Sequence, residues 1–142
     1  MKYIFLDIDG VLNASGDKNL IDGIIDEYKF NLLKLIIKYT NAYVVIISSR
    51  RIYLEDRNSL LRALDDIYDR ISFISYQINY KYRKDEINEY LKTHPCSNFV
   101  ILDDIDSKYS TDEFINKHFI CISTSIGLTV ENVKEAIKIL NK

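Results

Sequence analysis

Carboxylate side chains follow two short apolar runs of this sequence, at the point where each run ends. Asp7 and Asp9 come after YIFL, and Asp103 and Asp104 come after FVIL. Carboxylates that converge from two such runs repel one another unless a cation lies between them. Oxygen ligands without histidine or cysteine favour Mg²⁺, which binds one or two carboxylates together with a substrate phosphate. The pattern therefore predicts a magnesium site suited to phosphoryl transfer.

Hydroxyl and basic side chains follow the other apolar runs. After AYVVII come Ser48, Ser49 and Arg50, after ISFI comes Ser75, and after FICI come Ser123, Thr124 and Ser125. Ser48 and a nearby lysine are candidates to hold phosphate oxygens. Taken alone, Ser48 is also explained as a strand-end hydroxyl bonded to the backbone, so its assignment depends on the carboxylates lying close to it.

The five apolar runs predict the strands that position these side chains. They cover residues 3–6, 42–47, 71–74, 99–102 and 119–122, and their continuous hydrophobicity is typical of strands buried on both faces of a parallel sheet. Helix-period segments lie at residues 26–39, 54–69, 84–92 and 130–140. We therefore predict an α/β fold, a single doubly wound, three-layer α/β/α domain over residues 1–142 with a five-stranded, mainly parallel, Rossmann-like sheet. Ligands of such sheets bind beyond the carboxyl ends of the strands, so the polar groups should meet at one edge.

Two of the predicted helices carry more specific expectations. The spacing in residues 26–39 predicts one apolar stripe, made of Tyr28, Leu32, Leu35, Ile36 and Tyr39. Thr129 is the expected N-cap of the last helix, and Glu131 favours its N-terminus.

Composition and charge limit the class of protein. The chain has 142 residues, 47% of them hydrophobic, and a formal net charge of −2, which neither requires nor excludes a nucleic-acid partner. Cys96 and Cys121 form no CxxC pair and have no histidines at metal-ligand spacing, which favours reduced thiols. No apolar run approaches the ~18 residues that span a bilayer. We expect a soluble, cytoplasmic protein with no membrane partner, and the sequence does not indicate its oligomeric state.

The order of these polar positions resembles the four motifs of the haloacid dehalogenase-like (HAD) superfamily. FLDIDGVLN is similar to the first motif, VVIISSR to the second and VILDD to the fourth, while Lys84 suits the third. The tail ISTSIGLTVENVKEAIKIL resembles the closing segment of the HAD domain of multi-domain RNA-repair proteins, so the resemblance covers residues 1–141. Ser48-Ser49-Arg50 is also comparable to the Ser-x-Arg that ends the second strand in the phosphatase domain of phage polynucleotide kinase.

The resemblance implies roles for individual residues. Asp7 is the implied nucleophile that forms an aspartyl-phosphate, and Asp9 is the implied general acid and base. Gly10 allows the backbone to approach closely just after these acids. The implied magnesium ligands are Asp7, Asp9 through its backbone carbonyl, Asp104 and its neighbour Asp103; the implied phosphate-binding residues are Ser48, Ser49, Arg50, Arg83 and Lys84.

The basic residue of the third motif remains open among three neighbours. Lys84 is favoured for its spacing to Asp103, Arg83 is the closest rival because relatives of the RNA-repair subgroup often have Arg-Gly here, and Lys81 is the third. The intervals between the motifs leave no room for a cap domain. An uncapped HAD-like site resembles those that act on macromolecular ends or phosphoproteins.

Basic and aromatic residues near the expected site favour a nucleic-acid end as the substrate. They are Arg50, Arg51 and Arg57 after the second strand, then Lys81, Arg83 and Lys84 with the interleaved Tyr76, Tyr80 and Tyr82. Solvated charges and half-buried tyrosines explain them equally well. We predict a magnesium-dependent phosphatase of polynucleotide or nucleotide ends, with protein or small-molecule phosphomonoesters, or a non-catalytic HAD-like binding module, as alternatives. A two-component receiver does not match, because its acceptor aspartate follows the third strand, where this chain has Ser75.

Overall fold

The computed structural model describes residues 1–75 and 80–142. Its five strands form one sheet in the order β3-β2-β1-β4-β5, and every pairing is parallel. The strands are β1 (Lys2–Leu6), β2 (Tyr43–Ile46), β3 (Ile71–Phe73), β4 (Asn98–Asp103) and β5 (Phe119–Cys121). The predicted Rossmann-like sheet is therefore confirmed, and it is parallel throughout the described residues.

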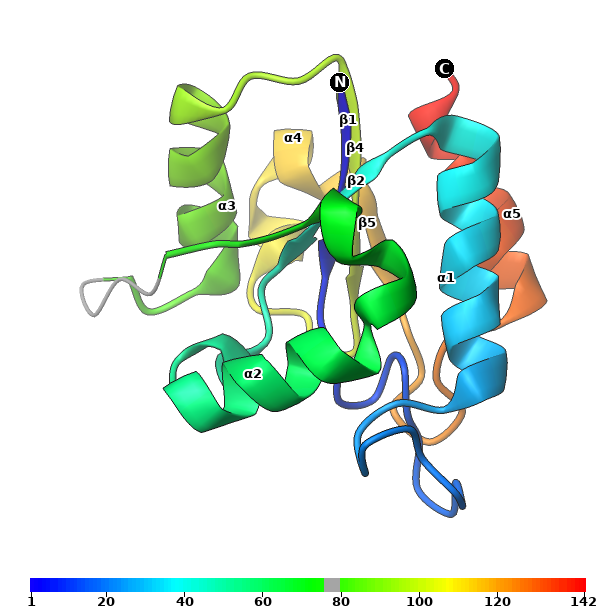
Figure 1. Cartoon of the computed structure of the whole chain (residues 1–142). Helices are drawn as coiled ribbons and strands as arrows, with labels where there is room; N and C mark the ends of the chain where they lie inside the picture. The colour runs from blue at the N-terminus through cyan, green and yellow to red at the C-terminus, as the bar shows by residue number, and fades with distance from the viewer. Residues whose placement is uncertain (76–79) are drawn as a thin grey trace.

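Helices cover both faces of the sheet (Figure 1). One face packs against α1 (Glu27–Thr40), α2 (Leu54–Ala63) and α5 (Val130–Leu140), and the other packs against α3 (Arg83–Thr93) and α4 (Glu113–Asn116). Within the described ranges no further domain covers the carboxyl ends of the strands, in agreement with the predicted absence of a cap. No helix of the described chain is long and apolar enough to cross a membrane.

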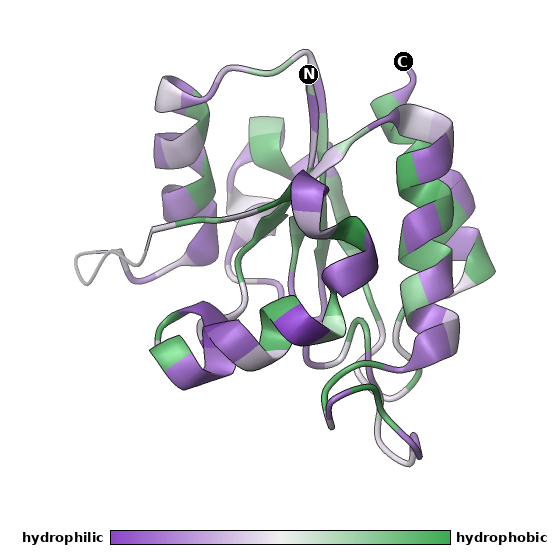
Figure 2. Cartoon of the chain, in the orientation of Figure 1, coloured by the Kyte–Doolittle hydropathy of each residue, from purple (hydrophilic) through white to green (hydrophobic). Residues whose placement is uncertain are grey.

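Alternate side chains of the central strands β1, β2 and β4 enter two separate cores. In β1, Ile4 and Leu6 join the core beneath α1 and α5, whereas Tyr3 and Phe5 join the core beneath α3. Hydrophobic residues accordingly run along the strands, while the helices alternate between hydrophobic and hydrophilic residues (Figure 2). Burial of each such side chain stabilises the fold by about 1.5–3 kcal/mol, which makes the sheet a rigid support for the residues at its edge.

The first helix begins where predicted but buries only Leu32 and Ile36 of the predicted stripe. The side chain of Asp26 caps it by accepting a hydrogen bond from the backbone N–H of Lys29 at 3.1 Å. The prediction was wrong for Tyr28, Leu35 and Tyr39, which are exposed, and the buried apolar residues are Phe30, Leu32, Leu33 and Ile36. A period of 3.6 residues is compatible with both stripes, and packing of α1 against the sheet and α5 selects one of them.

The other helices differ from prediction mainly at their ends. The segment expected to be helical over 54–69 leaves the α-helix at Ala63 and continues as a 3₁₀ segment (Asp65–Arg70), in which Ile67 has a non-helical φ of −121° and stays buried. The N-cap predicted for α5 is confirmed, because Thr129 and Asn132 form a reciprocal capping box. Between β4 and β5 the short α4 occupies a stretch for which no helix range was predicted.

Candidate active site

The carboxyl ends of the two central strands bring the predicted acids together. Asp7 directly follows β1, and its backbone N–H donates to the carbonyl of Leu102 at 2.9 Å. Asp103 is the last residue of β4, and its carbonyl accepts from the N–H of Ile122 at 2.8 Å. Both residues therefore remain in the hydrogen-bonded ladder, which gives their side chains defined directions at this edge.

Asp7, Asp103 and Asp104 form a compact group, which we call the acidic cluster. One oxygen from each carboxylate lies within 4.8 Å of the other two. Asp103 is fully buried and Asp7 is 4% exposed. One oxygen of Asp104 accepts from the hydroxyl of Thr124 at 3.0 Å, while its other oxygen, Oδ1, is buried without a hydrogen-bond partner among the described residues. A buried carboxylate oxygen without a partner is costly unless a cation binds it, so the cluster fits a divalent metal.

Gly10 allows the loop after β1 to lie against the acidic cluster. Its φ is +83°, and a Cβ placed on it would lie 2.1 Å from Oδ2 of Asp104. The turn that contains Gly10 is closed by hydrogen bonds from the N–H groups of Val11 and Leu12 to the carbonyl of Ile8. Only glycine satisfies both the backbone conformation and the space, which supports the close approach predicted here.

Arg83, from the first turn of α3, is the basic residue that contacts the acidic cluster. Its Nη1 donates to both oxygens of Asp103 at 3.0 and 2.9 Å and lies 3.3 Å from Oδ2 of Asp7. Lys84 was the favoured candidate for this place, but no ion pair or hydrogen bond joins it to the cluster in the part of the chain that the structure describes. Its charge instead adds to the hydrogen bonds from the backbone of Ile115 and from Asn88, which lower the pKa of Asp112. Adjacent helical residues point about 100° apart, so only one of the two can face the carboxylates.

Burial and charge crowding shift the pKa of the groups in this site. Burial raises the pKa of Asp7 to about 8; the charge of Arg83 opposes this rise, and the neighbouring Asp103 and Asp104 reinforce it. The pKa of Tyr109 is also raised, by burial and by Asp103, which accepts a hydrogen bond from its hydroxyl at 2.9 Å. One arginine does not neutralise the negative charge of three carboxylates. The site would therefore be stabilised by an additional cation.

Asp9 points toward Arg50 and away from the acidic cluster. The Nε and Nη2 groups of Arg50 each donate to one oxygen of Asp9 at 2.9 Å, and Asn13 donates to Asp9 at 3.1 Å. Burial tends to raise the pKa of Asp9, but these hydrogen bonds outweigh it and lower the pKa. Asn13 also accepts from the N–H of Gly10 and donates to the carbonyl of Ile24, so it joins the turn to the following loop. Its position inside FLDIDGVLN was the only signal in the sequence that could have identified it.

Ser48 lies at the end of β2 with its hydroxyl oxygen already in use. It is buried, and its Oγ accepts from the backbone N–H of Arg50 at 3.2 Å, which caps a 3₁₀ turn (Ser49–Arg51). Ser48 is therefore bonded to the backbone, as its position after a strand also suggested. Its hydroxyl hydrogen can still donate to a ligand. Ser49 beside it is exposed.

The basic residues near the site are less available than the sequence suggested. Arg51 is buried and bonded to backbone carbonyls and to Glu86, and the guanidinium of Arg57 lies 4.7 Å from the ring centre of Phe73. Among the aromatic residues predicted to stack on a ligand, Tyr80 and Tyr82 are half-buried, and Tyr76 lies outside the described residues. The prediction of two cationic clusters along the rim is therefore wrong for Arg51.

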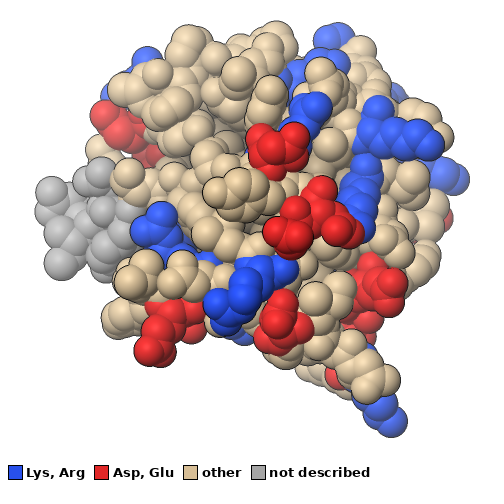
Figure 3. Space-filling view, viewed as in Figure 1, with Lys and Arg blue, Asp and Glu red and all other residues tan. Residues whose placement is uncertain are grey.

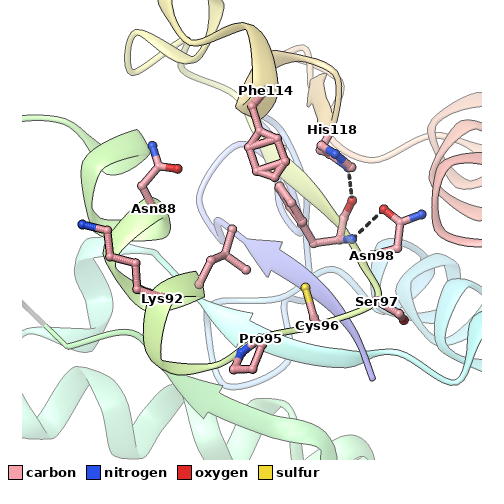
Figure 4. A pocket seen from close by; sticks show the side chains of 10 residues that line it. Asn88, Lys92, Pro95, Cys96, Ser97, Asn98, Phe114 and His118 are labelled. Atoms are coloured by element: carbon pink, nitrogen blue, oxygen red, sulfur yellow. Dashed lines mark hydrogen bonds between the residues drawn. The ribbon is translucent and has the colours of Figure 1, made fainter.

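A separate groove lies at the opposite end of the sheet and contains none of these groups. It is formed by the end of α3, the start of β4, Phe114 and His118 (Figure 4). Nδ1 of His118 donates to the backbone carbonyl of Phe99 at 2.8 Å, and the imidazole ring stacks on the ring of Phe99. The acidic cluster, and not this groove, is the candidate active site.

Comparison with protein families supports the resemblance that the motifs suggested. Residues 3–133 match the family described as the HAD domain in Swiss Army Knife RNA repair proteins. Neither the curated proteins nor the solved structures provided a match to the chain. The family indicates a phosphatase-type function, and the acidic cluster agrees with it as a group able to hold a metal ion. Since the match covers most of the chain and includes all four motif positions, this protein belongs to the HAD domains of Swiss Army Knife RNA repair proteins.

Proposed function

We propose that the protein is a magnesium-dependent phosphatase that acts through an aspartyl-phosphate on Asp7, with the phosphate end of a polynucleotide or nucleotide as its substrate. The observation that carries the proposal is the convergence of Asp7, Asp103 and Asp104 with Arg83 at the open edge of a parallel sheet. In the proposal Asp7 is the nucleophile, the three carboxylates are the candidate metal ligands and Arg83 is the fixed cation. Their closeness supports phosphoryl transfer, which depends mainly on positioning and charge neutralisation.

The ligand set fits Mg²⁺. Asp7 and Asp104 offer hard oxygen ligands, Asp103 lies beside them, and the unpaired Oδ1 of Asp104 is accounted for by a bound cation. When bound, Mg²⁺ would neutralise part of the negative charge shared by the carboxylates and the incoming phosphate. The backbone carbonyl of Asp9 remains a proposed fourth ligand.

In the proposed reaction a carboxylate oxygen of Asp7 attacks phosphorus and the bond from phosphorus to the leaving oxygen breaks. Asp9 gives a proton to the leaving oxygen, and then takes a proton from the water that cleaves the aspartyl-phosphate and frees inorganic phosphate and Asp7. The Ser48 hydroxyl and Arg83 hold the phosphate oxygens. Arg50 exchanges its contact with Asp9 for one with the phosphate, which returns the pKa of Asp9 toward the range in which it carries a proton.

The distribution of charge supports a phosphate end more than a long nucleic-acid backbone. Cationic and acidic side chains are interspersed on the face that Figure 3 shows. With Arg51 buried, the cations that we propose for one phosphate group are Arg83, which contacts the acidic cluster, and Arg50, which pairs with Asp9. A nucleic-acid end also agrees with the family, whose members are domains of RNA repair proteins.

The proposal is tested by comparing turnover of four phosphate esters in Mg²⁺. These are a 3′-phosphorylated oligonucleotide, a mononucleotide, a phosphotyrosine peptide and p-nitrophenyl phosphate, each assayed with wild-type protein and with Asp7→Asn. We expect turnover that is lost in Asp7→Asn and on chelation, with kcat/KM highest for the nucleic-acid end and falling as salt increases. Equal and salt-independent turnover of all four esters would contradict the nucleic-acid substrate, and no turnover of any of them would contradict the phosphatase.

A further inference from the structure

Arg51 is a buried arginine whose donors are spread over three elements. Nη1 donates to the carbonyls of Ile47 at 2.7 Å and Ser48 at 2.9 Å, at the end of β2. Nε donates to the carbonyl of Ile74 at 3.0 Å, directly after β3, and Nη2 pairs with the carboxylate of Glu86 in α3. One planar guanidinium group therefore connects the ends of two strands with the first turns of a helix.

Glu86 relates this contact to the acidic cluster. It follows Arg83 by three residues on α3, and residues with this spacing are neighbours on one side of a helix. The pair with Arg51 is therefore suited to fix the rotation of α3 about its axis near Arg83. The same guanidinium also holds the backbone of Ser48, which follows β2. In the sequence, β3 ends at Phe73 and α3 begins at Arg83. The guanidinium of Arg51 joins the end of β3 to α3 by direct hydrogen bonds.

Stability alone does not explain a charged pair at this place. Both partners are buried, with side-chain exposures of 5% and 10%. The desolvation of two such charges commonly cancels the attraction between them, and apolar residues of similar volume often stabilise a fold equally well. An apolar pair, however, could not bond the three strand-end carbonyls, and it would leave the rotation of α3 to non-directional packing.

We propose that Arg51 and Glu86 are positioning residues of this enzyme, which together fix Arg83 and Ser48 relative to the nucleophile Asp7. The inference rests on the proposed phosphatase function for its kinetic consequence, but its structural consequence does not depend on activity. Neither residue reaches the acidic cluster through any contact that the described chain shows, so both act through the groups that they hold.

Two conservative variants test the pair. Arg51→Lys keeps the charge, but one ammonium group cannot bond acceptors on three elements. Glu86→Gln keeps the size and an acceptor oxygen, but removes the ionic attraction. The matched control is Glu89→Gln with Lys92→Gln, which removes an exposed ion pair from the same helix. Each protein is measured for its thermal midpoint, for kcat and KM on p-nitrophenyl phosphate in Mg²⁺, and by crystallography for the distance from Nη1 of Arg83 to Oδ2 of Asp7, which is 3.3 Å here.

We expect folded Arg51→Lys and Glu86→Gln to lose about 10–100-fold in kcat with a smaller change in KM, since a displacement of about 1 Å at a reacting group has an effect of this size. Arg83 should move away from Asp7 in both crystal structures, and the control should match wild type. A folded variant with wild-type kcat and an unmoved Arg83 overturns the positioning role. If Arg51→Lys does not fold, Glu86→Gln decides by the same criteria. Wild-type protein without turnover contradicts the proposed function, and the position of Arg83 then decides the role of the pair by itself.

Discussion

Arg83 and Asp103 form a fork in which one guanidinium nitrogen donates to both carboxylate oxygens, at 3.0 and 2.9 Å. Asp103 is completely buried, so this contact is shielded from solvent and fixes Arg83 over the acidic cluster. The same nitrogen lies 3.3 Å from Oδ2 of Asp7, the proposed nucleophile. A cation held in this way can balance charge that develops during phosphoryl transfer without having to reorient.

The contact predicts that Arg83, and not Lys84, serves the third motif. Arg83→Ala should lower kcat/KM by about 10²–10³-fold, the usual effect of removing one fixed group that stabilises the transition state. Lys84→Ala is the matched control, because it removes a neighbouring cation that has no contact with the acidic cluster in the described structure, and it should change kcat/KM by less than about threefold. Steady-state kinetics on p-nitrophenyl phosphate measure both. A larger loss for Lys84→Ala than for Arg83→Ala would reverse the assignment.

Gly10 provides a test of how closely the first loop must approach Asp104. Gly10→Ala places a methyl group 2.1 Å from Oδ2 of Asp104 in a backbone conformation that alanine rarely adopts, so we expect both a loss of stability of about 2–4 kcal/mol and weaker magnesium binding. Gly16 is the control, since its φ of +87° imposes similar backbone strain but a Cβ there meets no atom within 4 Å. Gly16→Ala should cost only about 1 kcal/mol and leave magnesium binding unchanged. Denaturant unfolding and calorimetric titration with Mg²⁺ compare the two variants. Equal effects of Gly10→Ala and Gly16→Ala would show that the contact with Asp104 does not determine the effect at Gly10.

Tyr109 supports the acidic cluster from within the core. Its hydroxyl donates to Oδ2 of Asp103 at 2.9 Å, and both residues are fully buried. Tyr109→Phe should lower the free energy of unfolding by about 1–2 kcal/mol, because it leaves a buried carboxylate with one donor fewer. Tyr90→Phe removes a hydroxyl whose only polar neighbour among the described residues is Ser72 at 3.5 Å, and we expect a change within about 0.5 kcal/mol. Urea unfolding at neutral pH distinguishes these outcomes.

The ion pair of Asp17 with Lys29 should make the stability of the fold depend on pH. Lys29 is buried and its Nζ lies 3.0 Å from Asp17, and hydrogen bonding from Lys29 lowers the pKa of Asp17 below its ordinary value of 3.8. A lowered pKa means that the ionised form is favoured in the folded state, so the stabilisation is complete above pH 3.8 and is lost as the pH falls through the folded-state pKa. Asp17→Asn should therefore lower the thermal midpoint by about 2–4 °C at pH 7 and by less at pH 3. The control is Asp66→Asn, which removes an exposed pair with Lys34 and should lower the thermal midpoint less at pH 7. If Asp17→Asn lowers the thermal midpoint equally at pH 7 and pH 3, the charge of Asp17 does not have this role.

The elements of the fold were predictable because their signals are local. Each strand is a short apolar run that needs no knowledge of its partners, and Thr129 or Asp26 caps a helix through hydrogen bonds to residues three positions away. The end of each strand is equally local, so the sequence also predicted that Asp7 and Asp103 would share one edge of the sheet. The side of α1 that is buried was only partly predictable. Helical periodicity permits adjacent apolar stripes, and the contact of α1 with α5 selects between them.

The sequence by itself determined that carboxylates would follow β1 and β4, because each acidic pair comes directly after an apolar run, and that Gly10 would allow a close approach there. Only the tertiary structure decided which cation faces them, because the choice between Arg83 and Lys84 depends on the rotation of α3 about its axis. It also decided that Arg51 is an internal link and no surface charge. These outcomes depend on distances between elements far apart in the chain, for which no residue type or spacing provides a signal.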